Sequence, residues 1–222
     1  MTCEIRTTAP VFGEVERGIY IDFEGRVGRQ PALLGVFDPE ADLEAQVRQI
    51  VLEPALAPAA TASGLEVADI ERQVEALVAL AERDGRTLIG WSSREPHAVR
   101  DHCSPELAAR FEALYRDARK AARSWRRRTG RQLPASSTAR GHALSRYARL
   151  IGYEATSSLW GIGSARIIAD LEDAFGRGAT WDQLGRGNAR WRRKGRWTRM
   201  LHHNELDCRA TYEVARVATA RS

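Results

Sequence analysis

Residues 19–26, IYIDFEGR, hold the two acids whose spacing best suits a chemical role. The apolar, β-forming side chains around them predict a strand, on which residues two apart point to the same face. Asp22 and Glu24 would then converge, and their mutual repulsion requires a positive charge between them. A hard divalent cation such as Mg²⁺ or Mn²⁺ prefers oxygen ligands of this kind. The alternative is an edge strand that carries the pair by chance.

A second group of reactive side chains lies at 202–211, HHNELDCRAT. The apolar spacing that follows predicts a helix, on which His203 and Asp207 are four residues apart and share one face. An imidazole and a carboxylate so placed can hold a metal ion and orient a water molecule. The alternative is an ordinary helix start, where the helix dipole favours acids.

The two segments together resemble the DEDD 3′–5′ exonuclease superfamily, which has a ribonuclease H-like fold. More narrowly, IYIDFE and HNELDCRAT resemble the bacterial RNase H-like domains found beside RecB-type nucleases. His203 stands where the last motif of that group, which reads like YNEDDCRAT, has a tyrosine. His202 satisfies the H-x4-D spacing of the histidine-type exonucleases, so the spacing leaves both histidines open as the base.

The resemblance also places an acid after the short strand expected at 87–91. An Asp follows this strand in the family, at a helix start, and the residue in register here is Glu95, within SSRE. Asp101 is the alternative, about two helical turns farther along and therefore too distant. Tyr115 and Asp117 could supply a further polar contact.

A two-metal mechanism with Mg²⁺ or Mn²⁺ is what the resemblance implies. Asp22, Glu24 and Asp207 would hold one ion that activates a water, and Asp22 with Glu95 would hold a second that neutralises the leaving oxygen. The implied activity is hydrolysis of phosphodiester bonds in DNA or RNA, as a 3′–5′ exonuclease. The catalytic residues would be Asp22, Glu24, Glu95, His203 and Asp207, with His202 as the alternative base.

The main alternative is a non-catalytic nucleic-acid-binding or scaffolding protein with a degenerate site. Glu95 in place of Asp, and His203 in place of Tyr, favour it. Three retained acids favour the enzyme, because a degenerate site has no physical need of carboxylates that repel one another. A hydrolase of another substrate is a third alternative, since fold does not fix function.

Arginine and tryptophan are interleaved over 176–199, GRGATWDQLGRGNARWRRKGRWTR. Aromatic rings among guanidinium groups suit a single-stranded nucleic acid, whose bases stack and whose phosphates pair with arginine. The alternative is that Trp181, Trp191 and Trp197 anchor short helices to the core while the arginines are solvated. The residues predicted to contact DNA or RNA, with single-stranded ends, are Arg190, Trp191, Arg192, Arg193, Lys194, Arg196 and Trp197.

Charge is divided unevenly along the chain. Residues 1–110 contain 11 Lys and Arg against 19 Asp and Glu, whereas residues 111–222 contain 23 against 10. An acidic half beside an arginine-rich half favours a phosphate-facing surface. The alternative is an arginine-rich composition that reflects genome base usage.

Composition indicates a cytoplasmic location. No apolar run approaches the ~20 residues of a membrane span, and the first residues, MTCEIRTT, lack the apolar region of a signal peptide. Three scattered cysteines without a C-x-x-C pair indicate a reducing compartment. We expect no membrane partner, and a helicase or nuclease is a candidate protein partner.

The elements that must position these residues form an α/β pattern. Strands are expected at 18–24 and 31–37, joined as a hairpin across GRVGRQ, and at 48–52 and 87–91. The early hairpin argues against a pure Rossmann or TIM arrangement. Helices are expected over 65–83, after Ser92-Ser93, and over 105–126, 140–151, 162–175 and 203–219, with a connector at 54–62 and a loop at 126–140.

The sequence therefore predicts one domain, 1–222, with a ribonuclease H-like mixed sheet flanked by helices. Its core would span about 18–219. A basic helical C-terminal elaboration would include the Trp- and Arg-rich insertion at about 176–199.

Overall fold

A six-stranded sheet lies at the centre of the molecule, in the order β4-β3-β2-β1-β5-β6. β1, β2 and β3 are antiparallel neighbours, whereas the β1–β5, β5–β6 and β3–β4 pairs are parallel, so the fold is α/β with a mixed sheet, as predicted. The computed structural model describes residues 5, 7–135, 141–153, 163–184 and 188–220, with backbone alone over 188–192. The strands are β1 (Ile19–Gly25), β2 (Pro31–Phe37), β3 (Val47–Val51), β4 (Glu66–Val67), β5 (Leu88–Gly90) and β6 (Tyr115–Asp117).

The predicted hairpin is confirmed by β1 and β2. Gly28 in the turn between them has a φ of 74°, a backbone conformation that glycine adopts without strain. The register sets Asp22 opposite Gly35. β2 is buried along its whole length between β1 and β3, which accounts for its unbroken apolar sequence, PALLGVF.

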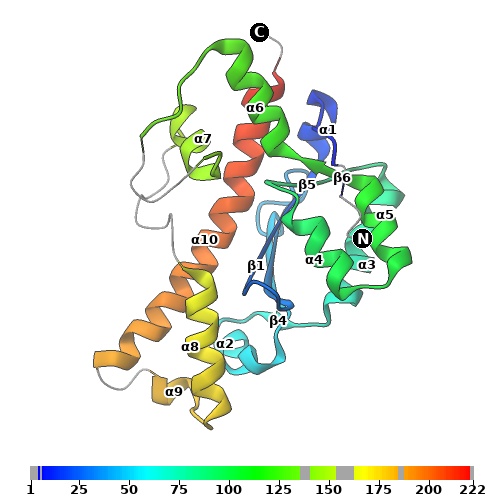
Figure 1. Ribbon diagram of the computed structural model, residues 1–222. Helices are drawn as coiled ribbons and strands as arrows, with labels where there is room; N and C mark the ends of the chain where they lie inside the picture. Colours follow the sequence, from blue (N-terminus) through cyan, green and yellow to red (C-terminus); the bar gives the residue numbers. More distant parts are fainter. Residues whose placement is uncertain (1–4, 6, 136–140, 154–162, 185–187, 221–222) are drawn as a thin grey trace.

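Alternate residues of β1 point to opposite faces of the sheet. Ile19 and Ile21 pack against the helices of one face, α3, α4 and α5. Tyr20 lies on the other face, in a cluster with residues of α10. Figure 1 shows α10 as one long helix on that side of the sheet, with α3, α4 and α5 on the opposite side. These helices are α3 (Ile70–Asp84), α4 (Arg94–His102), α5 (Pro105–Leu114) and α10 (Asn188–Thr219).

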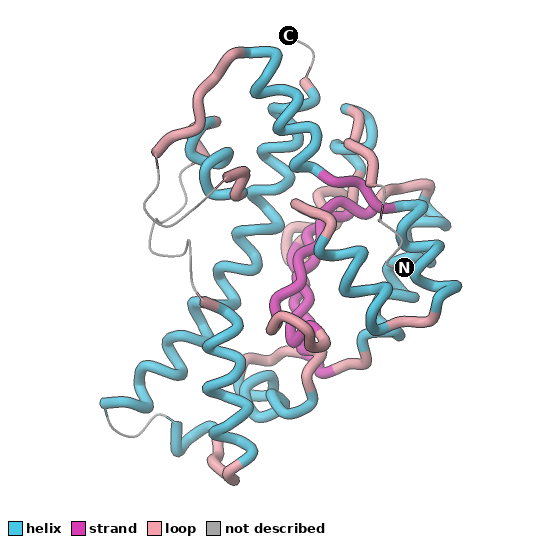
Figure 2. The backbone as a smooth tube through the Cα atoms, viewed as in Figure 1, coloured by secondary structure: helices cyan, strands magenta, loops and turns pink. Residues whose placement is uncertain are grey.

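Two groups of helices pack against the two halves of α10 (Figure 2). The N-terminal half of α10 packs with α2, α8 and α9, and its C-terminal half packs with α6 and α7. No described helix combines the length and the apolar character that crossing a membrane requires. The remaining helices are α1 (Phe12–Arg17), η1 (Pro54–Leu56), α2 (Ala57–Ala62), α6 (Ala118–Thr129), α7 (Leu144–Leu150), α8 (Ser164–Gly176) and α9 (Trp181–Leu184).

The helix predicted over 105–126 is wrong in its middle. α5 ends at Leu114, and the next three residues form β6, which pairs in parallel with β5. α6 then begins at Ala118. The pairing with β5 at the edge of the sheet prevails over a helical period that continues through the segment, because strand formation depends on tertiary context.

Other boundaries also differ from the prediction. The connector expected at 54–62 is helical, and its alanines pack against α8. The helix expected over 65–83 begins only at Ile70, after β4, and the loop expected at 126–140 begins after Thr129. The helix expected over 203–219 begins at Asn188, so the second half of the 176–199 segment belongs to α10. Residues 136–140 lie outside the described part of the chain.

Candidate metal centre

β1 directs its two acids toward α10. Asp22 and Glu24 follow Tyr20 at intervals of two, so they share the face of the sheet that α10 covers. Both carboxylates line a cleft of about 900 Å³ that opens at this end of β1. The predicted convergence of the pair on one face is therefore present.

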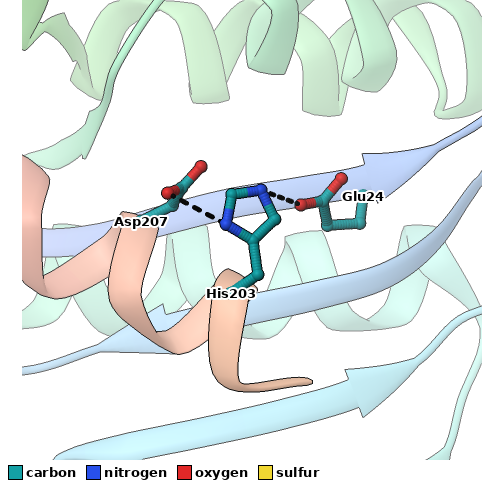
Figure 3. A group of neighbouring side chains, drawn as sticks. All are labelled: Glu24, His203 and Asp207. Atoms are coloured by element: carbon teal, nitrogen blue, oxygen red, sulfur yellow. Dashed lines mark ion pairs between the residues drawn. The ribbon is translucent and has the colours of Figure 1, made fainter. Parts of the chain in front are cut away.

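α10 brings an imidazole and a third acid to the same place. His203 lies between two carboxylates, with its Nε2 3.6 Å from Glu24 Oε1 and its Nδ1 3.5 Å from Asp207 Oδ1 (Figure 3). One ligand atom from each of these three residues lies within 4.8 Å of the others. His202 is exposed and is not among the residues that line the cleft, so the geometry favours His203 over His202 as the base.

α4 supplies the fourth acid from its first turn. Glu95 is buried, lines the same cleft, and accepts hydrogen bonds from the Tyr115 hydroxyl at 2.9 Å and from Ser92 Oγ at 3.3 Å. Asp101 also lines the cleft but is exposed. Asp117 is buried at the end of β6 and is not among the cleft residues. The position of Glu95 therefore fits a ligand better than that of either alternative acid.

Burial raises the pKa of every acid in this group, and repulsion by neighbouring acids adds to this effect for Glu24, Glu95 and Asp207. The pKa of Glu24 rises to about 8, through burial first and then repulsion by Asp22. Burial raises the pKa of Asp22 to about 6, and burial together with repulsion by Asp22 raises that of Glu95 to about 7. Asp207 has a pKa well above its usual range for the same reasons, while burial lowers the pKa of His203. The group therefore resists carrying its full negative charge at neutral pH.

A divalent cation fits this donor set. In the part of the chain that the structure describes, none of the four carboxylates forms an ion pair with Lys or Arg. Asp207 Oδ1 is buried and accepts no hydrogen bond from any described residue. Carboxylate oxygens around a cleft are the ligands that Mg²⁺ and Mn²⁺ prefer, and the imidazole beside them is available as a base. The residues present therefore suit a metal ion by both charge and ligand type.

Asn204 is a site residue to which sequence reasoning gave no role. Its Nδ2 donates to the Asp22 backbone oxygen at 3.1 Å and to Asp22 Oδ2 at 2.9 Å, and its Oδ1 accepts from Gln49 at 3.0 Å. A Cβ on Gly35 would lie 2.2 Å from Asn204 Oδ1, so only glycine leaves room for this contact. Ser164 Oγ likewise donates to Glu24 Oε2 at 2.6 Å. The available signal for Asn204 was its place beside His203 within the helix motif.

The predicted nucleic-acid contact of Trp197 is wrong, because its side chain is fully buried. Trp197 packs in the cluster that joins α10 to α2 and α8, and its Nε1 donates to Ser63 Oγ at 2.9 Å. Its ring is therefore not available to a base, and it anchors the helix. The side chains of Arg190, Trp191 and Arg192 lie outside the described part of the structure.

The described basic residues of this segment lie away from the acids. Arg193 lines a separate hollow beside α8 and α9. Lys194 lies 3.8 Å from Asp182 and above the ring of Trp181, and Arg196 pairs with Asp170 at 3.1 Å. None of these three cations lines the cleft that holds the carboxylates.

Comparison with known proteins adds no assignment. No protein-family model, curated protein or solved structure matches this chain.

Proposed function

We propose that this chain is a divalent-metal-dependent nuclease that hydrolyses phosphodiester bonds of DNA or RNA. The observation that carries the proposal is the convergence of four carboxylates, Glu95 buried and the other three half-buried, and one imidazole, from three separate elements, on one cleft. Burying such a cluster lowers the stability of the fold, so its presence points to a function that requires it. The resemblance of the two acid motifs to the DEDD exonucleases supports 3′–5′ exonuclease action on a ribonuclease H-like fold.

Asp22, Glu24 and Asp207 would hold one Mg²⁺ or Mn²⁺, and Asp22 with Glu95 would hold a second. When bound, the cations lower the pKa of a water and offset negative charge on the leaving oxygen. The chain itself places these acids at the floor of the cleft, where the side chains of Glu24 and Asp207 are only 12% and 21% exposed. A phosphodiester must enter the cleft to reach them.

His203 is positioned to accept the proton of the attacking water. Because burial lowers its pKa, the imidazole is neutral at pH 7 and has one ring nitrogen able to accept. As the water oxygen forms its bond to phosphorus, His203 accepts the water proton and the phosphorus–oxygen bond to the leaving group breaks. The leaving oxygen then takes a proton from solvent, and Asp207 beside His203 stabilises the imidazolium formed.

The proposal is tested by following end-labelled single- and double-stranded DNA and RNA with Mg²⁺, Mn²⁺ or EDTA. We expect stepwise, metal-dependent shortening that falls by at least about 100-fold in Asp22→Asn and in Glu95→Gln, because each change removes charge from the ligand set. Asp101→Asn is the matched control: it removes an exposed carboxylate at the same cleft and should leave the rate unchanged.

Binding without cleavage under every metal would contradict the proposal and favour the non-catalytic alternative. Loss of activity in Asp101→Asn with full activity in Glu95→Gln would reverse the assignment of the fourth acid. Activity that persists in EDTA would exclude the metal mechanism.

A further inference from the structure

Three arginines on α6 form no salt bridge with any described carboxylate, although Asp117, at the start of the helix, lies near enough to the first of them for attraction. Several arginines of the described structure form a salt bridge with a nearby carboxylate, as Arg86 does with Asp38. Among described residues, no carboxylate forms such a pair with the members of what we call the arginine row. The arginine row is Arg119, Arg123 and Arg126.

The arginine row follows one flank of its helix. Its members are spaced i, i+4 and i+7, which places them one above another on a helix surface. The neighbouring face of α6, with Ala121, Ala122 and Trp125, is buried against α7 and α10. α6 starts beside β5 and β6 and runs along the C-terminal half of α10 (Figure 1). The row thus leads away from the sheet along one direction.

The first member of the row reaches the acid-lined cleft. Arg119 lines it, as do His142 and Trp91, whose Nε1 donates to the His142 backbone oxygen at 3.1 Å. Burial lowers the pKa of His142, and repulsion by the nearby cations lowers it further; these are Arg123, Arg126, Arg119 and Arg146. The cations therefore gather around one ring at the cleft wall, beside an aromatic side chain.

A single strand suits this arrangement better than a duplex. The acids lie on the floor of a cleft of about 900 Å³, a volume in the range of small-ligand pockets, which admits a few nucleotides of one strand. Grooves that bind single strands combine cations that follow the phosphates with aromatic rings that contact bases. The row and Trp91 supply both kinds of contact.

We propose that a single strand of nucleic acid enters along the arginine row, with its phosphates against Arg119, Arg123 and Arg126 and its end at the acids. The placement of that end rests on the proposed nuclease function, whereas contact with the row does not. The path differs from the predicted one through 190–197, where Lys194 and Arg196 are already paired with acids.

The experiment measures binding of a fluorescent single strand of about 16 nucleotides, as DNA and as RNA, by anisotropy in EDTA. The test variant is Arg119→Gln with Arg123→Gln, which leaves half-buried Arg126 in place. The control, Arg48→Gln with Arg72→Gln, removes the same charge from exposed positions outside the cleft and away from α6. A third variant, Arg193→Gln with Lys194→Gln, tests the other path. Circular dichroism confirms that each variant is folded.

We expect the test variant to raise Kd roughly tenfold, and the slope of log K against log salt to fall in magnitude by about 1.4, or 0.7 for each lost phosphate contact. The control and the third variant should stay within about twofold of wild type. The inference would be overturned if the test variant and the control lost affinity equally, or if the third variant lost more. Equally tight binding of a blunt duplex, or no binding by wild type, would also overturn it.

The two proposals fail separately. If binding depends on the arginine row but no metal supports cleavage, the nuclease proposal is refuted and the proposed strand path stands. If cleavage depends on metal but the test variant binds as wild type does, the nuclease proposal stands and the proposed strand path is refuted.

Discussion

Asn204 holds Asp22 at two points, through its backbone oxygen and its carboxylate. The contact orients Asp22 and lowers its pKa against the larger effect of burial. It exists because Gly35, opposite Asp22 in the hairpin, has no side chain to keep the amide away. A strand residue of ordinary size at this place would separate α10 from β1.

Gly35→Ala tests this close approach. The added Cβ would lie 2.2 Å from Asn204 Oδ1, so Asn204 must move and lose its bonds to Asp22. We expect the free energy of unfolding to fall by about 1–3 kcal/mol, and metal affinity, measured by calorimetry, to fall as well.

Gly13→Ala is the control, since a Cβ there meets nothing within 4 Å. Alanine at this helical position should leave stability unchanged or raise it slightly. A neutral Gly35→Ala with unchanged metal affinity would show that the Asn204 contact does not position Asp22.

At the scale of elements, α10 is the member that joins the acid site to both helical groups. Its N-terminal half is fixed by Trp197, which packs with α2 and α8, and its C-terminal half packs with α6 and α7. His203 and Asp207 lie between these anchors, so their position depends on both ends of the helix being held.

Trp197→Ala should therefore destabilise the fold without removing a nucleic-acid contact. Loss of a fully buried Trp costs about 3–5 kcal/mol, to be measured by urea unfolding. Trp197→Phe, which keeps most of the apolar volume, should lose less. If Trp197→Ala weakened oligonucleotide binding while stability stayed the same, the anchoring role would be wrong.

The predictable elements are those whose signal is local. The hairpin and β5 were predicted from their alternating or apolar runs and, for the hairpin, from the glycine turn. Asp22 and Glu24 were predicted because they are two apart on a strand, and Asp207 because it is four residues from a histidine on a helix. β6 was missed because its pairing partner, β5, is remote in sequence. The first turns of α10 were missed because an Arg- and Trp-rich segment shows no apolar period, and packing of Trp197 and Met200 stabilises it as helix.

At the scale of the whole molecule, the acid cluster links stability to pH. The folded-state pKa values of Glu24 and Glu95, about 8 and 7, lie above those of an unfolded chain, so the folded state binds protons more tightly. Their contribution is fully present below about pH 4 and is lost as pH rises through 7 and 8. His203, with a lowered pKa, has the opposite sign, but its effect ends above about pH 6.5.

In EDTA the free energy of unfolding should fall between about pH 6.5 and 8.5, by on the order of a few kcal/mol. Mg²⁺ or Mn²⁺ should reduce this fall, because a bound cation offsets the charge that the rising pH creates. Glu24→Gln should flatten the profile in EDTA. Denaturant unfolding across this range is the measurement, and stability that rises with pH in EDTA would contradict the linkage.

The position of α10 late in the chain has a consequence during synthesis. A polypeptide released before residue 203 would contain Asp22, Glu24 and Glu95 but lack both His203 and Asp207. It would also lack most of the helix that covers the acid-bearing face of the sheet. In the proposed nuclease, a prematurely terminated product therefore has no hydrolytic site. If the chain is the proposed nuclease, this order of the elements would keep incomplete chains from cleaving the nucleic acids around a translating ribosome.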